Sequence, residues 1–210
     1  MRVSASGQGR VSSLLCLDAL VCERDGQPLF GPISLTIEAG ERVELVGKNG
    51  SGKSTLLRTL AGLHTQYSGH FTASDLLYQG HLIGLDPLLT VLENLQWFSS
   101  VDGDASTDLS KLFDLLDTFG LLAKAHTLCH ALSAGQQRRL AMVRWTLSSR
   151  KLWLLDEPIT ALDEQGQGLL LACLQQHCAA GGAVLYATHA ALNLSPKTEL
   201  CLQAVEDRLC

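Results

Sequence analysis

The chain has 210 residues, 46% of them apolar and 18% charged, with a formal net charge of −5 at pH 7. This length fits one domain with a sizeable core, and the negative charge argues against nucleic acid as a partner, because nucleic acid requires a positive surface. Seven scattered cysteines without a CxxC pair predict reduced thiols and neither a zinc site nor a disulfide framework, and no apolar run reaches the roughly 18 residues that span a bilayer.

The first strands are predicted near the N-terminus. Residues 1–12 are rich in glycine and serine, and we expect them to be disordered. Residues 14–22 and 33–38 alternate apolar and polar side chains well enough for strands with one buried face. Because Asp18 interrupts the apolar stretch 14–21, this stretch is interpreted as a strand and not as a signal peptide.

A glycine-rich loop between a short strand and a helix predicts a phosphate-binding P-loop. The strand is residues 42–46 and the helix spans about 53–61. The loop and the first helical turn comprise Gly47, Lys48, Asn49, Gly50, Ser51, Gly52, Lys53, Ser54 and Thr55. Glycines let backbone N–H groups surround a phosphate without Cβ clashes, and the helix N-terminus adds partial positive charge. We expect Lys53 to bridge the β- and γ-phosphates, Ser54 to ligate Mg²⁺ and Thr55 to add a phosphate contact.

The middle of the chain is predicted to be helical. Thr90 and Glu93 have the spacing of a capping box, which opens a helix to about residue 99. Asp108 begins a second helix after a polar loop at 101–107. The apolar face of this second helix comprises Leu109, Leu112, Phe113, Leu116 and Phe119. We interpret the two helices as part of an inserted helical subdomain, at about 81–131.

The last third of the chain alternates helices and strands. A helix is predicted from Ser133 to about residue 148, and residues 152–155 form a continuous apolar strand of the kind found in parallel sheets. A helix at 164–179 and a strand at 183–187 follow. This order predicts an α/β fold with a mostly parallel core sheet, helices on both faces, and an antiparallel β part at the N-terminus.

Two carboxylates follow the apolar strand 152–155. At its carboxyl end, Asp156 can hold Mg²⁺ through water, as such carboxylates do in phosphoryl transfer. Glu157 comes next and can polarise the attacking water as a general base. His189 follows the last predicted strand, where an imidazole can reach the γ-phosphate and hold Glu157 and the water in line.

A second anion site is predicted at residues 132–136. Ser133 caps a helix and Gln136 completes its capping box, so a hydroxyl, an amide and a helix N-terminus meet there, beside Gly135. One fold needs a single cradle for the γ-phosphate, so the second is expected to serve a partner's nucleotide in a two-fold, head-to-tail dimer. The alternative is an ordinary helix cap.

These motifs, in this order, resemble those of the ATP-binding-cassette (ABC) ATPase family, over essentially the whole chain from residue 14. Residues 47–54 match its Walker A motif, 132–136 its signature, 152–157 its Walker B motif and 161–163 its D-loop. The resemblance implies a P-loop NTPase fold and a homodimer, with ATP and Mg²⁺ as cofactors. It implies catalysis by Lys53, Glu157 and His189 (the switch histidine), Mg²⁺ held by Ser54 and Asp156, and nucleotide contacts from Ser133, Gly135, Gln136 and Asp163.

The chain departs from this family pattern at three positions. Ala134 stands where most members have glycine in the signature. The position of the usual loop glutamine falls on His81 rather than Gln79, and an imidazole, unlike an amide, titrates near neutrality. The position of the aromatic residue that stacks on adenine falls on Arg24, whose guanidinium plane either stacks on the base or lies in solvent.

Several stretches narrow the resemblance to the ATP-binding subunits of the cytochrome c maturation system. They are residues 22–25, 78–81, 132–139 and 156–163. The resemblance implies a peripheral protein on the cytoplasmic face of a bacterial inner membrane, with the integral membrane subunits of the cytochrome c maturation complex as partners. Its ATP hydrolysis would serve haem export or the release of a haem-loaded chaperone. The alternative is the ATPase subunit of another small-molecule ABC transporter; direct haem binding, for example by Cys129-His130, is not expected.

Overall fold

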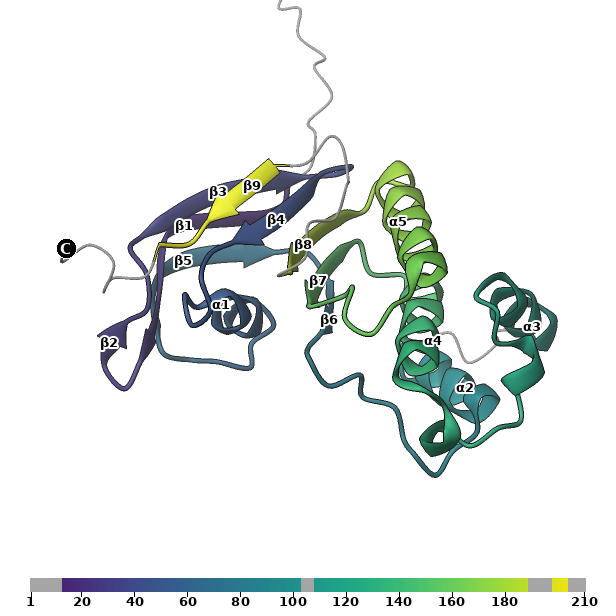
Figure 1. Cartoon of the computed structure of the whole chain (residues 1–210). Helices are drawn as coiled ribbons and strands as arrows, with labels where there is room; N and C mark the ends of the chain where they lie inside the picture. The colour runs from purple at the N-terminus through teal and green to yellow at the C-terminus, as the bar shows by residue number, and fades with distance from the viewer. Residues whose placement is uncertain (1–12, 103–107, 189–197, 204–210) are drawn as a thin grey trace, which may run out of the picture.

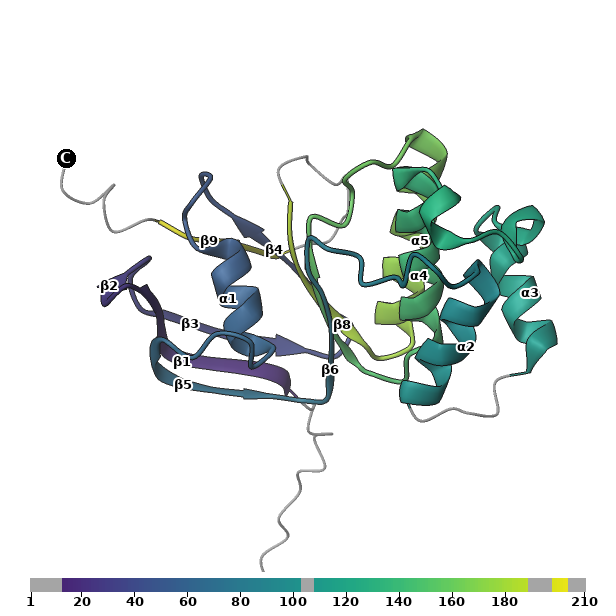
Figure 2. The ribbon, with the colours of Figure 1, turned by 90° about the horizontal axis from the view of Figure 1, so that it is seen from below.

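The computed structural model describes residues 13–102, 108–188 and 198–203. Two sheets and two groups of helices are stacked along the molecule (Figure 1). An antiparallel sheet and α1 (Lys53–Leu60) lie on one side of a parallel sheet, and the other long helices lie on its opposite side. The view from below shows the same layers, with the parallel sheet between α1 and the group α2–α5 (Figure 2).

The antiparallel sheet is built around the long strand β1 (Ser13–Arg24). β1 pairs with β3 (Ile33–Glu38), β5 (Tyr67–Ala73) and the short β2 (Gln27–Pro28). β1 and β2 are joined through Asp25 and Gly26, which have φ angles of 52° and 76°. A two-residue Asp-Gly turn with positive φ matches the twist of a hairpin, so the chain reverses tightly directly after Arg24.

The core sheet has the strand order β6-β7-β8-β4-β9, and each neighbouring pair is parallel. Its strands are β4 (Arg42–Val46), β6 (Leu76–Gln79), β7 (Leu152–Asp156), β8 (Ala183–Ala187) and β9 (Thr198–Cys201). β7 and β8 are buried along their whole length. Because every strand of a parallel sheet ends at the same edge, β4 and β7 deliver the P-loop and the Asp156-Glu157 pair to one place.

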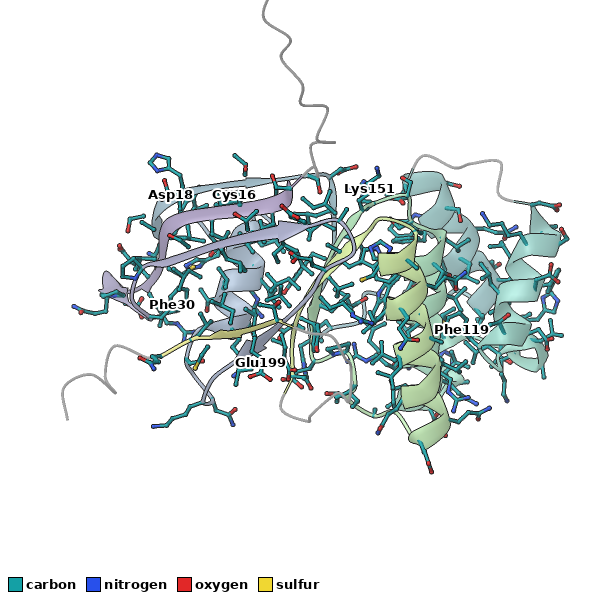
Figure 3. All side chains as sticks on the ribbon, turned by 90° about the horizontal axis from the view of Figure 1, so that it is seen from above. Cys16, Asp18, Phe30, Phe119, Lys151 and Glu199 are labelled. Atoms are coloured by element: carbon teal, nitrogen blue, oxygen red, sulfur yellow. The ribbon has the colours of Figure 1, made fainter. Side chains whose placement is uncertain are left out.

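Successive residues of β7 and β8 pack into two separate hydrophobic cores. Leu152 and Leu154 join the core that surrounds α1 and the antiparallel sheet. Trp153 and Leu155 join the core formed with the helices α2 to α5. Among the side chains labelled in Figure 3, Phe30 belongs to the first core and Phe119 to the second. The sheet is therefore covered on both faces, as its continuous apolar strands predict.

The helices begin at the residues that their caps predict. α2 (Val91–Val101) and α4 (Ala134–Leu147) each have a complete capping box, Thr90 with Glu93 and Ser133 with Gln136. Asp108 caps α3 (Leu109–Thr118), and Asp163 caps α5 (Glu164–Ala179). Two short 3₁₀ helices, η1 (Leu122–Lys124) and η2 (Cys129–Ala131), lead into α4. None of the helices in the described residues is both long and apolar enough to cross a membrane.

The predicted fold class is confirmed, and several details were wrong or missing. The strands β2, β5, β6 and β9 were not predicted. α2 continues to Val101, which was assigned to the following loop. Leu109 was placed on the buried face of its helix but is 47% exposed, because it occupies the first turn of α3, outside the core formed by Leu112 and Leu116. Residues 1–12 lie outside the described residues.

Candidate nucleotide site

The loop between β4 and α1 has the backbone geometry of an anion cradle. Gly50 and Gly52 have φ angles of 82° and 98°, which side chains of L-residues rarely allow. A Cβ atom on Gly52 would lie 2.7 Å from Phe30 Cδ1, and one on Gly47 would lie 2.6 Å from the carbonyl oxygen of Leu202. Glycine is therefore required at these positions for the loop to take this path.

Polar groups of the P-loop point into this cradle. Lys53 is 7% exposed, and its Nζ donates hydrogen bonds to the carbonyl oxygens of Gly47 at 2.7 Å and Lys48 at 3.0 Å. The hydroxyl of Ser51 is buried and has no hydrogen-bond partner within the described part of the chain. Buried polar atoms are normally paired, so an unpaired hydroxyl in a glycine cradle at a helix N-terminus fits a phosphate group.

A cavity of about 600 Å³ opens beside the cradle and collects most of the predicted site residues. Its lining includes Arg24, Asn49, Gly50, Gly52, Lys53, Ser54, Thr55, His81, Asp156 and Glu157. Leu29, Arg58 and Thr160 also line it and were not predicted. Arg58 lies one turn beyond Ser54 on α1, a helical spacing that could have placed it at the same cavity.

Ser54 and Asp156, predicted as magnesium ligands, are brought together by the fold. The hydroxyl of Ser54 donates a hydrogen bond to Asp156 Oδ1 at 3.0 Å, across 102 residues of sequence. Asp156 is 4% exposed and lies at the end of the buried strand β7. A hydroxyl and a carboxylate at this separation are the hard oxygen donors that Mg²⁺ takes together with phosphate oxygens, so these residues fit the ion.

Glu157 lines the same cavity, and its backbone has an unusual conformation. Its φ angle is 54°, an unusual value for a residue with a side chain, and its N–H donates to the carbonyl oxygen of Ala187 at 2.8 Å. This bond to β8 holds the backbone directly after the strand end. Local strain of this kind is common where a side chain must be aimed at a reacting group.

Gln79 and His81 have different surroundings. Gln79 is 5% exposed; its amide nitrogen donates to the carbonyl oxygens of Gly80 and Leu82, and its oxygen accepts from Trp145 Nε1 at 3.3 Å. His81 lines the nucleotide cavity. Of these two residues, His81 is the one that lines the cavity. Arg24 reaches the same cavity from the end of β1.

The signature residues line a second cavity, of about 480 Å³. Ser133, Gly135, Gln136 and Asp163 contribute to it. Arg139 NH2 donates to both carboxylate oxygens of Asp163, at 2.7 and 2.9 Å. The backbone N–H of Gly166, followed by Arg139, lowers the pKa of Asp163 below its ordinary value, so this carboxylate stays charged.

The sequence also singled out His189 and the Cys129-His130 pair. His189, the predicted switch histidine, lies outside the described residues. In the Cys129-His130 pair, the Cys129 thiol is 1% exposed and accepts a hydrogen bond from Asn94 Nδ2 at 3.1 Å, whereas a ring nitrogen of His130 contacts the carbonyl oxygen of Pro87.

The sequence is similar to a large group of ATP-binding proteins. A family model described as ABC transporter matches residues 30–160. The cytochrome c biogenesis ATP-binding export protein CcmA of Pseudomonas savastanoi pv. phaseolicola is 42% identical over 191 residues, 85% of this chain and 89% of that protein. CcmA of Haemophilus ducreyi is 37% identical over 190 residues, 83% of this chain and 89% of that protein.

Solved structures show the same fold. An ATP-binding protein of an ABC transporter from Pyrococcus furiosus matches with a TM-score of 0.79 at 23% identity, covering 90% of this chain and 96% of that one. A metal-chelate type ABC transporter in an inward-facing conformation matches with a TM-score of 0.76 at 24% identity, covering 91% and 80%. Because the family model spans more than half of the chain and the relatives match most of it, this chain belongs to the ABC transporter family, as an ATP-hydrolysing subunit of the CcmA type.

Proposed function

We propose that this chain hydrolyses ATP to drive a membrane complex of cytochrome c biogenesis, by exporting haem or releasing a haem-loaded chaperone. The observation that carries the proposal is the meeting of the P-loop, the Ser54–Asp156 pair and Glu157 at one cavity, in a chain 42% identical to a CcmA protein. We assign the ATPase domain to residues 13–210, with a helical subdomain at about 81–131. Its place is the cytoplasmic face of a bacterial inner membrane, as a peripheral subunit.

The chemistry follows from the side chains at the first cavity. Lys53 binds the β- and γ-phosphates, with the N–H groups of residues 47–52 around them. Ser54 and, through water, Asp156 would hold Mg²⁺, and the bound ion would supply positive charge beside the phosphate oxygens. Glu157 orients the attacking water and accepts its proton, and His189 is assigned to hold Glu157 and the water in line. Arg24 and His81 contact the base and the γ-phosphate side of the nucleotide.

A second copy of the chain completes each site. Family membership implies that ATP-binding subunits pair and act on membrane subunits. Ser133, Gly135 and Gln136 form an anion site outside the first cavity, which suits the γ-phosphate of a partner's nucleotide. In a head-to-tail dimer each nucleotide then joins two subunits, so ATP binding closes the dimer and hydrolysis reopens it.

The membrane partners are integral subunits of the cytochrome c maturation complex. Exposed apolar side chains are concentrated on the segment that follows β6: Leu82 is 84% exposed, Leu88 76% and Trp97 57%. Three large apolar side chains exposed on one segment of the chain fit a surface that a partner covers. This segment begins beside His81, so a partner bound there is directly connected to the nucleotide cavity.

Glu157→Gln tests the mechanism. The amide cannot accept the proton of the attacking water, so we expect ATP turnover to fall by roughly 100-fold or more. ATP binding should persist, and a closed dimer should accumulate with MgATP in size-exclusion chromatography. Glu164→Gln is the matched control, because Glu164 is exposed at the start of α5 and should leave turnover unchanged. Full turnover in Glu157→Gln would contradict the assigned base.

A pull-down tests the biology separately. The tagged chain is recovered from detergent-solubilised native membranes, and integral proteins bound to it are identified by mass spectrometry. Recovery of cytochrome c maturation subunits supports the proposed role. Recovery of an unrelated permease would replace that role by the alternative, the ATPase subunit of another small-molecule ABC transporter, with the same nucleotide chemistry.

A further inference from the structure

Arg138 is a buried charge whose hydrogen-bonding groups are incompletely used. It lies on α4 and is 3% exposed. Its Nε and NH1 atoms are buried and have no hydrogen-bond partner within the described residues. A buried donor without an acceptor costs about 1–3 kcal/mol, and more when the group is charged. The two unpaired nitrogen atoms therefore cost stability, and this cost calls for a role of Arg138 other than stabilising the fold.

The charges around Arg138 belong to the catalytic site. Burial lowers the pKa of Arg138, while the negative charges of Glu157 and Asp156 raise it in part. A guanidinium group remains protonated in proteins, so Arg138 keeps its positive charge. Its free donors thus lie within the electrostatic reach of the carboxylate that activates water.

Other arginines of α4 are paired with acceptors. Arg139, the next residue, binds both carboxylate oxygens of Asp163. Arg144, two turns further along, donates through NH1 to the carbonyl oxygens of Ile83 at 2.9 Å and Gly84 at 3.0 Å, although its Nε is also unpaired. Among these three arginines, Arg138 is the one with two buried, unpaired nitrogen atoms.

α4 carries both Arg138 and residues of the second cavity. The first turn of α4 carries Ser133 and Gln136 at the second cavity, and Arg138 follows two residues after Gln136. A helix moves as a rigid rod over such a distance, so a ligand bound at its first turn fixes the position of Arg138 as well. A small shift of a buried fork of donors is enough to make or break hydrogen bonds, because these weaken steeply with distance and angle.

We infer that Arg138 is a positioning residue for hydrolysis. When a partner's nucleotide binds the first turn of α4, the unpaired N–H groups of Arg138 hold the Glu157 carboxylate in place for the attacking water. This inference rests on the proposed role of Glu157 as general base. Hydrolysis then depends on occupation of the second cavity, since the same helix carries Arg138 and the residues that line this cavity. Arg138 itself does not touch the reacting atoms.

Arg138→Met provides the main test, in the full-length chain with MgATP. Met has a similar volume and no donors, so the unpaired charge is removed without a large cavity. We expect kcat to fall by roughly 10- to 100-fold, the loss typical of a misplaced catalytic group, with KM changed less than about twofold. The melting temperature should stay the same or rise. Arg138→Lys keeps the charge and should restore part of kcat.

Arg144→Met is the matched control, because it removes an arginine of the same helix whose NH1 is hydrogen-bonded. It should lower the melting temperature. Equal losses of melting temperature in Arg138→Met and Arg144→Met would show that Arg138 is structural and would overturn the inference.

A double-mutant cycle with Glu157→Gln separates the inference from the proposed function. If Arg138 acts through the Glu157 carboxylate, Arg138→Met should not lower the residual single-turnover rate of Glu157→Gln any further. Additive losses would overturn the inference and leave Glu157 as the base. Full turnover of Glu157→Gln alone would instead contradict the proposed function, whatever Arg138 does.

Discussion

Gly135 and Ala134 are adjacent residues of the signature, and the structure allows a side chain at only one of them. A Cβ atom on Gly135 would lie 2.8 Å from the carbonyl oxygen of Ala161, a backbone atom that cannot rotate away. Ala161 has a φ angle of 66°, so this loop is already in a conformation that side chains disfavour. Ala134, where most family members have glycine, starts α4 with ordinary helical geometry. The departure from the family pattern is therefore compatible with an intact cavity.

Gly135→Ala should displace the segment 161–163 from the first turn of α4. Overlap of this size costs about 1–3 kcal/mol, and the displaced segment lines the second cavity, so we expect roughly tenfold lower kcat for ATP in the dimer. Ala134→Gly is the control: it adds only the entropic cost of glycine, about 0.5–1 kcal/mol, and should change kcat little. Steady-state ATPase assays and thermal melts measure both. Equal kcat values for the two variants would contradict the predicted overlap.

At the scale of elements, α2 and α4 begin with the same device and differ in what surrounds it. Thr90 with Glu93 and Ser133 with Gln136 both form complete capping boxes. The hydroxyl in each box accepts a hydrogen bond from the backbone N–H of the third helical residue, at 3.2 Å. Only the box of α4 lines a cavity with other predicted site residues. A comparison of the two caps can therefore distinguish the structural role of a capping residue from a role in nucleotide binding.

Thr90→Ala and Ser133→Ala should have similar effects on stability and different effects on turnover. Each removes one N-cap, which is worth about 1 kcal/mol, so both variants should lose similar free energy of unfolding in urea. Ser133→Ala should in addition lower ATP turnover at least tenfold, because it removes a hydroxyl proposed to bind the partner's nucleotide. If turnover falls equally in both, Ser133 is only a helix cap, the alternative that the sequence left open.

At the scale of the whole molecule, we expect His177 to make the free energy of unfolding depend on pH. His177 of α5 stacks on Trp153 of β7 with ring centroids 3.6 Å apart, and a ring nitrogen contacts the carbonyl oxygen of Lys151. Burial lowers the pKa of His177 below its ordinary value of about 6.5. Protonation is therefore harder in the folded chain than in the unfolded one. This contact joins α5 to the core sheet, so its loss is felt in global unfolding.

The stability of the chain should fall as the pH is lowered through about 6.5. Above pH 7.5, His177 is neutral in both states and contributes no pH dependence; below 6.5 the unfolded chain binds a proton that the folded chain does not, until the pH passes the folded pKa. His177→Phe keeps an aromatic ring on Trp153 and should flatten this slope between pH 8 and 5.5. Urea unfolding across this range measures it, with pH 8 as the internal reference. An unchanged slope in His177→Phe would show that His177 is not the titrating group.

Local sequence determined the parts of this protein whose stability is local. The caps of α2, α3 and α4, the continuous apolar strands β7 and β8, and the glycine cradle before α1 all follow from neighbouring residues, and the structure confirms each of them. The family and its two groups of nucleotide motifs could also be predicted from the sequence, because a motif is defined by residue types at short, fixed spacings.

Only the tertiary structure decided what depends on partners far away in the sequence. β5 has little alternation of its own and forms because it pairs along β1. The side-chain oxygen of Gln79 accepts a hydrogen bond from Trp145, 66 residues later, whereas His81 lines the nucleotide cavity. Arg138 is buried with two unpaired nitrogen atoms, a fact that no spacing in the sequence contains. The physical reason is the same in each case: hydrogen bonding, desolvation and charge depend on which groups the fold brings together.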